Sequence, residues 1–201
     1  MSGGLGVFGG TFDPPHVAHL AIALAACESA GLERVLFVPA LRSPLKEDGP
    51  VAGPEDRSRM VELAIAGEPR FALSRIELER DAPSFTVDTL ERLAAEHPGK
   101  RLFLILGSDA LADLGRWRRP ERVRELATLL VAARPGAPPP DPALGAVAFD
   151  APLLDLTARG LRARAAAGRS LRYLVPEPVW RYIEERGVYR AQRGSTSPRT
   201  T

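Results

Sequence analysis

The densest group of residues able to do chemistry lies near the N-terminus, in Gly9-Gly10-Thr11-Phe12-Asp13-Pro14-Pro15-His16-Val17-Ala18-His19. Two of the three histidines, His16 and His19, stand three residues apart at an expected helix start, so both rings lie on one face. Glycines after a strand let a phosphate approach the backbone, and a helix start offers unpaired N–H donors. The pattern favours a phosphate-binding turn. Two alternatives stay open: a helix start with surface histidines, and a partial metal site using Asp13.

Strands and helices that could position this segment alternate along the chain. Apolar runs predict strands over 5–8, 34–38, 101–106, 127–132 and 147–149, with one or two short strands in 71–78. Helices are predicted over 17–30, 55–66, 84–96, 120–126, 158–167 and 178–186, the third with Ser84 and Thr86 as N-cap residue types. This order predicts an open, mostly parallel α/β sheet with helices on both faces. In such folds ligands bind at the carboxyl ends of the strands.

Composition and charge exclude several other classes of protein. The 201 residues include 27 basic and 25 acidic side chains, for a formal net charge of +2. Basic residues alternate with acidic ones, which argues against a nucleic-acid partner. No apolar run could cross a bilayer, the N-terminus lacks the features of a secretory signal, and we expect no membrane association. The lone Cys27 cannot form an intrachain disulfide, so we expect it to fill space in the core of a cytoplasmic protein.

The length predicts one domain over residues 1–190. The polar segment 191–201 is expected to be a disordered tail. The oligomeric state stays open, and a homo-oligomer is one option.

Five segments in order resemble one enzyme family. Gly9 to Leu20 resembles the HxGH signature of the nucleotidylyltransferase superfamily, and its wording TFDPPH is similar to bacterial nicotinate-nucleotide adenylyltransferases. Four further segments resemble the same family: Phe37-Val38-Pro39-Ala40 with Ser43-Pro44-Leu45-Lys46, Pro83 to Leu90, Leu106-Gly107-Ser108-Asp109-Ala110 with Trp117, and Arg172 to Pro176 with the residues up to Tyr189. The resemblance implies a Rossmann-like nucleotidylyltransferase fold. It also implies adenylyl transfer from ATP to nicotinate mononucleotide, giving deamido-NAD and pyrophosphate in NAD biosynthesis.

The resemblance also implies roles for individual residues. His16 and His19 are the expected catalytic residues, and the expected ATP or phosphate contacts are Gly9, Gly10, Thr11, Phe12, Lys46, Gly107, Asp109, Thr157, Arg159 and Arg162. The expected contacts of nicotinate mononucleotide are Ser84, Phe85, Thr86, Trp117 and Arg134. Thr86 at a helix start suits a carboxylate, and Trp117 can stack on a pyridine ring. Mg²⁺ enters with ATP, and we expect neither a resident metal nor a tightly bound cofactor.

One segment departs from the family's pattern. A second phosphate motif, ISSTxIR, aligns with Leu156-Thr157-Ala158-Arg159-Gly160-Leu161-Arg162, which lacks two of the hydroxyl groups. Arg159 brings a guanidinium in their place, and Gly160 weakens the helix start. This erosion motivates one alternative, a nucleotide-binding protein with weakened catalysis. Another alternative keeps adenylyl transfer but changes the acceptor to nicotinamide mononucleotide or phosphopantetheine.

Overall fold

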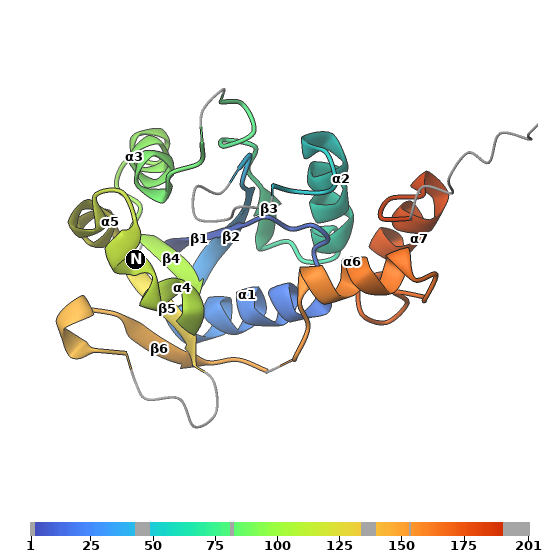
Figure 1. Cartoon of the computed structure of the whole chain (residues 1–201). Helices are drawn as coiled ribbons and strands as arrows, with labels where there is room; N and C mark the ends of the chain where they lie inside the picture. The colour runs from blue at the N-terminus through green and yellow to red at the C-terminus, as the bar shows by residue number, and fades with distance from the viewer. Residues whose placement is uncertain (1–2, 43–48, 81–82, 134–139, 153, 191–201) are drawn as a thin grey trace, which may run out of the picture.

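A six-stranded sheet forms the centre of the computed structural model, which describes residues 3–42, 49–80, 83–133, 140–152 and 154–190 (Figure 1). Its strands are β1 (Gly4–Gly10), β2 (Leu32–Pro39), β3 (Phe71–Leu73), β4 (Leu102–Gly107), β5 (Ala127–Ala133) and β6 (Val147–Asp150). They lie in the order β3-β2-β1-β4-β5-β6, and each neighbouring pair is parallel. The predicted open α/β sheet is confirmed. The order of the strands reverses between β1 and β4, where such sheets bind ligands.

Helices cover both faces of the sheet, as predicted. They are α1 (Val17–Ala30), α2 (Pro54–Ile65), α3 (Thr86–Glu96), α4 (Ser108–Ala112), α5 (Pro120–Leu126), α6 (Ala158–Ala166) and α7 (Glu177–Arg186), with short 3-10 turns η1 (Leu114–Arg116) and η2 (Pro142–Leu144). Helices α1 and α2 share one core with the sheet, while α3 and α5 share the core on its other face (Figure 1).

Successive side chains of a strand point to opposite faces of the sheet, so each strand contributes residues to both cores. Leu36 and Val38 pack toward α3 and α5, whereas Val35 and Phe37 pack toward α1 and α2. A strand covered on both faces needs apolar residues at every position, which explains why the sequence shows continuous apolar runs. Gly6 serves this packing too, because a Cβ there would lie 2.9 Å from the side chains of Leu32 and Val35.

The first helix matches its predicted bounds. Gly31 adopts the left-handed conformation, with φ of 58°, and its N–H donates to the carbonyl of Cys27. Glycine adopts this conformation without the Cβ clash of other residues, so the helix ends there. Cys27 is 3% exposed within the core, which confirms its expected role in packing.

A third core joins the C-terminal segment to the rest of the molecule. Residues of α6 and α7 pack with Met60 of α2, and Tyr189 closes this cluster after α7. Figure 1 shows α6 and α7 beside α2 and the beginning of α1. The carboxyl end of β1 is therefore surrounded by parts of the chain that are far apart in sequence.

The segment 71–78 holds one short strand, β3, followed by a turn, which agrees with the prediction of one or two short strands. Two other local predictions were wrong or incomplete. Helix α3 begins at Thr86 instead of residue 84, and its N-cap is Phe85. Helix α4 was not predicted, because its five residues are too few to show a helical period.

The segment 191–201, for which we expect a disordered tail, lies outside the described residues. Among the described helices, none has the length and apolar character that crossing a membrane requires.

Candidate active site

The glycine turn at the end of β1 leaves open space beside its backbone. A Cβ at Gly9 would meet no atom within 4 Å, whereas one at Gly10 would lie 3.0 Å from the ring of Phe12. Phe12 has a left-handed φ of 49°, which turns the chain away from the sheet. Its ring is buried and packs edge-on against Phe8 and His19, with centroids 5.7 and 5.1 Å away. The ring of Phe12 thus belongs to the core, which leaves its backbone for the expected phosphate contact.

The two histidines of the same segment are stacked. His16 is the N-cap of α1, and its ring centroid lies 3.7 Å from that of His19. The backbone N–H of His16 donates to Nδ1 of His19 at 3.1 Å. A neutral His19 ring with this acceptor carries its proton on Nε2, which makes Nε2 a donor.

His16 is the more buried ring of the pair. It is 5% exposed, and its Nδ1 has no hydrogen-bond partner among the described residues. Burial lowers the pKa of His16 from 6.5 to about 4, so the ring is neutral at pH 7. A buried polar atom without a partner is costly, and such atoms are often completed by a ligand.

Asp13 ties the turn to distant parts of the chain. Its carboxylate is 1% exposed and accepts from the N–H groups of Val51 and Ala52 at 2.7 and 3.1 Å. It also accepts from the hydroxyl of Tyr189 at 2.6 Å, and the Asp13 carbonyl accepts from Arg162 at 2.8 Å. Burial and the nearby carboxylate raise the pKa of the Tyr189 hydroxyl. Asp13 therefore holds the glycine turn to the segment at Val51, to Arg162 and to the C-terminal Tyr189.

A fully buried arginine completes this framework. Arg57 of α2 is 0% exposed and donates to the carbonyls of Thr11, Ala40 and Ala52 at 2.9, 2.7 and 3.2 Å. Burial lowers the pKa of Arg57, and the charge of Asp13 opposes that shift. The guanidinium holds the ends of β1 and β2 in place through their backbones. Sequence reasoning missed this role of Arg57.

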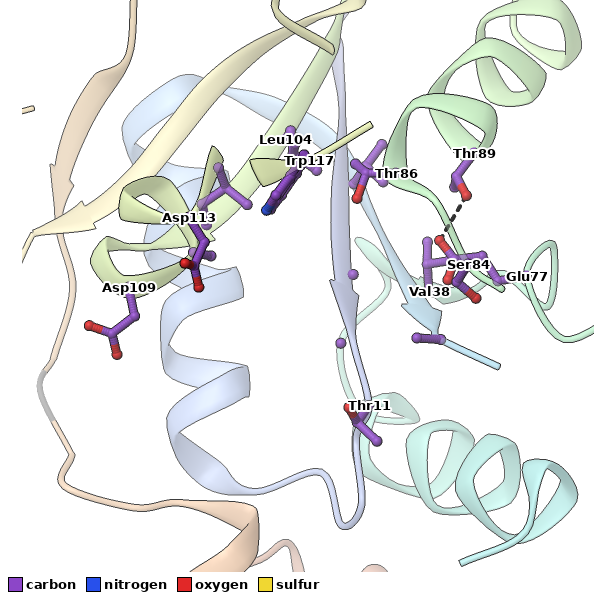
Figure 2. A pocket seen from close by; sticks show the side chains of 16 residues that line it. Thr11, Val38, Glu77, Ser84, Thr86, Thr89, Leu104, Asp109, Asp113 and Trp117 are labelled. Carbon is purple, nitrogen blue, oxygen red and sulfur yellow. Dashed lines mark hydrogen bonds between the residues drawn. The ribbon is translucent and has the colours of Figure 1, made fainter. Parts of the chain in front are cut away.

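A cavity of about 490 Å³ opens at the carboxyl ends of β1, β2 and β4. Figure 2 shows Thr11 at one end of it and Thr86 with Trp117 at the other. The lining residues are Val7, Gly9, Gly10, Thr11, Val38, Ala40, Glu77, Ser84, Thr86, Thr89, Leu104, Leu106, Asp109, Ala110, Asp113 and Trp117. The cavity therefore joins the glycine turn, the start of α3 and the Trp117 turn.

The far end of the cavity is the N-terminus of α3. Its N-cap, Phe85, provides no side-chain hydrogen bond, so the first backbone N–H groups are not capped by that residue. Thr86 is the first residue of the helix and lines the cavity together with Trp117. A helix N-terminus is suited to an anion, and an indole is suited to a flat ring.

Ser84 does not cap α3 as predicted. Its hydroxyl accepts instead from the N–H of Leu41 at 3.0 Å, which ties the loop after β2 to the loop before α3. Glu77 beside it was missed from the sequence. Its carboxyl is 6% exposed and accepts from the hydroxyl of Thr89 at 2.7 Å (Figure 2). Burial raises the pKa of Glu77, while Thr89 and Ser84 oppose that shift.

The eroded motif forms the start of α6. Thr157 is the N-cap, and its hydroxyl accepts from the N–H of Gly160 at 3.1 Å. Arg162, one turn later, reaches the Asp13 carbonyl and lies 3.6 Å from the Asp13 carboxylate. The helix is thus attached to the turn that carries the histidines. Arg159 lies in the first turn of the same helix.

Of the remaining expected contacts, Gly107 and Asp109 are described by the structure, whereas Lys46 and Arg134 are not. Gly107 is the N-cap of α4, and Asp109 in the first turn of α4 lines the cavity. Lys46 and Arg134 lie outside the described residues.

Comparisons with known proteins agree with this geometry. Residues 7–180 match the family described as cytidylyltransferase-like. A relative from Geobacillus kaustophilus, named a probable nicotinate-nucleotide adenylyltransferase, is 42% identical over 99% of this chain and 92% of its own length. A relative of the same name from Thermus thermophilus is 46% identical over 92% of this chain and 99% of its own length.

Solved structures extend the likeness to the fold. The nicotinic acid mononucleotide adenylyltransferase of Plasmodium falciparum, solved in complex with NaAD, has a TM-score of 0.75 at 17% identity. The match covers 94% of this chain and 98% of that one. The shared fold, the matched family and the close relatives agree, and the chain belongs to the nicotinate-nucleotide adenylyltransferases of the cytidylyltransferase-like family.

Proposed function

We propose that the protein transfers the adenylyl group of ATP to nicotinate mononucleotide. The observation that carries this proposal is one cavity that joins Gly9, Gly10 and Thr11 to Thr86 and Trp117. The first group offers backbone beside open space, and the second offers a helix N-terminus and an indole. Family membership supplies the reaction, because the relatives carry the name of this activity.

The chemistry needs no general base in the site. An ionised phosphate oxygen of nicotinate mononucleotide attacks the α-phosphorus of ATP, and a new P–O bond forms. The bond from the α-phosphorus to the oxygen bridging it to the β-phosphorus breaks, and pyrophosphate leaves with that electron pair. Catalysis can then consist of positioning the two substrates and stabilising charge on the phosphates.

The stacked histidines suit the triphosphate. His19 Nε2 is a donor once Nδ1 accepts from the His16 backbone, and His16 keeps an unused buried nitrogen. Neutral N–H donors placed before the reaction stabilise developing charge without having to reorganise. We assign His19 to contact the phosphate that is transferred, and we assign His16 to contact the neighbouring phosphates of ATP. The backbone N–H groups of Gly9 to Phe12 contact the phosphates as well in this proposal.

The segment that departs from the family's pattern faces the same substrate in this proposal. Thr157, Arg159 and Arg162 at the start of α6, with Lys46, Gly107 and Asp109, complete the expected ATP contacts. Arg162 is already held at Asp13, so its guanidinium sits beside the turn that carries the histidines.

In this proposal, nicotinate mononucleotide occupies the end of the cavity at Thr86 and Trp117. Its carboxylate meets the start of α3 at Thr86, and its ring stacks on Trp117. Ser84 and Phe85 shape that end of the cavity, and Arg134 is kept as a further expected contact.

Magnesium fits this arrangement as part of the nucleotide substrate. Among the described residues, no three His, Cys, Asp or Glu side chains gather to hold an ion. Mg²⁺ typically binds through substrate phosphates with one or two carboxylates, and Asp109, which lines the cavity, is the carboxylate among the expected ATP contacts. When bound, the ion would neutralise phosphate charge. We also propose that the protein works in the cytoplasm on small molecules.

Product analysis with one variant tests the assignment. Incubation with ATP, Mg²⁺ and nicotinate mononucleotide should give deamido-NAD and pyrophosphate in equal amounts. Trp117→Ala should raise the KM for nicotinate mononucleotide roughly tenfold while leaving the KM for ATP unchanged, because ring stacking contributes on that scale. Trp117→Phe, which keeps an aromatic face, should have a smaller effect. Absence of the dinucleotide product would refute the function, and an unchanged KM in Trp117→Ala would refute the stacking role.

A further inference from the structure

The side wall of the cavity contains a buried carboxyl group that the proposed reaction does not use. Glu77 lies in the turn after β3, is 6% exposed and lines the cavity. Removing a carboxyl group from water is costly unless hydrogen bonds compensate for the lost hydration. The hydrogen-bond partners of Glu77 therefore indicate what this group does in the wall.

Two hydroxyl groups bind the Glu77 carboxyl. The hydroxyl of Thr89, in α3, donates to Oε1 of Glu77 at 2.7 Å. The hydroxyl of Ser84, two residues before α3, forms a second hydrogen bond with the carboxyl. Thr89 and Ser84 are both buried, so water does not compete for these bonds. One carboxyl group thus holds α3 and the segment that leads into it.

Ser84 extends this contact to the loop after β2. Its hydroxyl oxygen accepts from the N–H of Leu41 at 3.0 Å, which leaves the hydroxyl proton for Glu77. The preceding residue, Ala40, donates its N–H to the carbonyl of Gly10 at 2.8 Å. A path of hydrogen bonds and backbone therefore runs from α3, through Glu77 and Ser84, to the glycine turn.

This path connects the two ends of the cavity. Figure 2 shows Glu77 and Ser84 between Thr89 of α3 and Thr11 of the glycine turn. In the proposed function, the acceptor lies at Thr86 in α3, and the triphosphate lies at the glycine turn. The distance between the two ends then sets the distance between the reacting atoms. A displacement of about 1 Å can cost roughly 100-fold in rate.

We propose that Glu77 is a positioning residue that fixes the distance between the acceptor end and the triphosphate end of the cavity. This rests on the proposed function and adds what holds its two substrates in reach of each other. Glu77 acts through the hydroxyl groups of Thr89 and Ser84 and takes no part in bond formation. When Glu77 is altered, each substrate still binds at its own end, but the reacting atoms are held less well at attack distance.

Glu77→Gln tests this role with little change in shape. The amide keeps one acceptor oxygen, but its NH₂ group cannot accept from a hydroxyl. The single-turnover rate of deamido-NAD formation at saturating substrates should fall roughly tenfold or more, because the two ends are no longer fixed. The dissociation constants of ATP alone and of nicotinate mononucleotide alone, measured by calorimetry, should stay unchanged.

Three further variants identify the bonds that matter. Thr89→Val replaces the hydroxyl with a methyl group and should also lower the single-turnover rate. Thr89→Ser keeps the hydroxyl and should retain most of that rate. Glu79→Gln is the matched control, because Glu79 lies in the same turn as Glu77 but has a 55% exposed side chain paired with Arg92. Glu79→Gln should leave the rate unchanged.

The possible outcomes separate positioning from other roles of Glu77. A weaker affinity of Glu77→Gln for one substrate, with an unchanged single-turnover rate, would overturn the inference by showing a binding contact. A lower denaturation midpoint with an unchanged rate would overturn it too, because Glu77 would then serve stability alone. Equal losses of rate in Glu77→Gln and Glu79→Gln would contradict it as well. Absence of the dinucleotide product with the unmodified protein would instead defeat the proposed function, and this inference with it.

Discussion

The two ends of the cavity are held together in opposite ways. Beneath the glycine turn, Asp13, Arg57 and Tyr189 are 1%, 0% and 8% exposed, and their partners are mostly backbone groups. At the other end, α3 and α5 are joined by ion pairs such as Arg119–Glu91, whose side chains are 47% and 35% exposed. Buried polar networks are costly to break, whereas exposed pairs contribute little.

The difference matches what the proposed function asks of each end. In that proposal, the turn at Gly9 and Gly10 must hold its backbone N–H groups in one geometry around a triphosphate, and buried hydrogen bonds to carbonyls fix that backbone. The end at Thr86 and Trp117 must attract an anionic acceptor, and exposed charges can assist this with little effect on stability. Variants of the buried residues at the first end should therefore lower the stability of the protein, while variants at the second end should mainly alter how strongly it binds its substrate.

The largest effect is expected at Arg57. Arg57→Met should lower the free energy of unfolding by about 3–5 kcal/mol, because three carbonyls, one buried and two partly buried, lose the donor that a fully buried guanidinium gives them. Urea denaturation measures this. Arg59→Met in the same helix, at a 56% exposed side chain, should change it by no more than about 0.5 kcal/mol. Similar losses in both variants would contradict the distinction between the two ends.

The next effect is a pH dependence at His16. Its pKa is lowered from 6.5 to about 4 in the folded protein, so the unfolded chain binds the proton more readily. The stability due to the neutral ring is complete above pH 6.5 and is lost as the pH falls to about 4, a change of about 3 kcal/mol. His16→Gln should lose clearly less stability across that window. Parallel stability curves for the two proteins would show that His16 does not titrate in this way.

The smallest effect is expected in the exposed cluster. Glu91→Gln removes one of the two carboxylate partners of both Arg119 and Arg122, and should lower the denaturation midpoint only slightly. The remaining difference should vanish in about 1 M salt, where exposed charges are screened. Thermal melts at two salt concentrations measure this. A large drop in the denaturation midpoint that persists in high salt would contradict this, because it would show that the exposed ion pairs contribute as much to stability as the buried network of Asp13, Arg57 and Tyr189.

Local signals allowed much of the fold to be predicted from the sequence. Gly31 ends α1 as expected, and the apolar run predicted over 101–106 forms the largely buried strand β4. Ser84 has the residue type of a helix cap, yet its hydroxyl binds Leu41, which is 43 residues away. A propensity describes what a residue can do locally, and it does not say which distant partner competes for it.

The candidate site was predictable where neighbours in sequence form it. Gly9, Gly10 and the histidine pair stand in one segment, so their types and spacing were visible. Asp13 binds Tyr189 across 176 positions, and Arg57 reaches Thr11 across 46. An arginine in an amphipathic helix normally lies at the surface, so nothing in the sequence marked Arg57 as buried. Long-range hydrogen bonds of this kind appear only once the fold is known.

The central claim is that the stacked histidines bind the phosphates that react. The most direct measurement is kcat/KM for deamido-NAD formation in His19→Ala and in His97→Ala, a matched change at the C-cap of α3. His19→Ala should lose about 100-fold or more, as removing a donor to developing charge does, and His97→Ala should stay within about twofold. A His19→Ala protein that is folded and as active as His97→Ala would contradict the account.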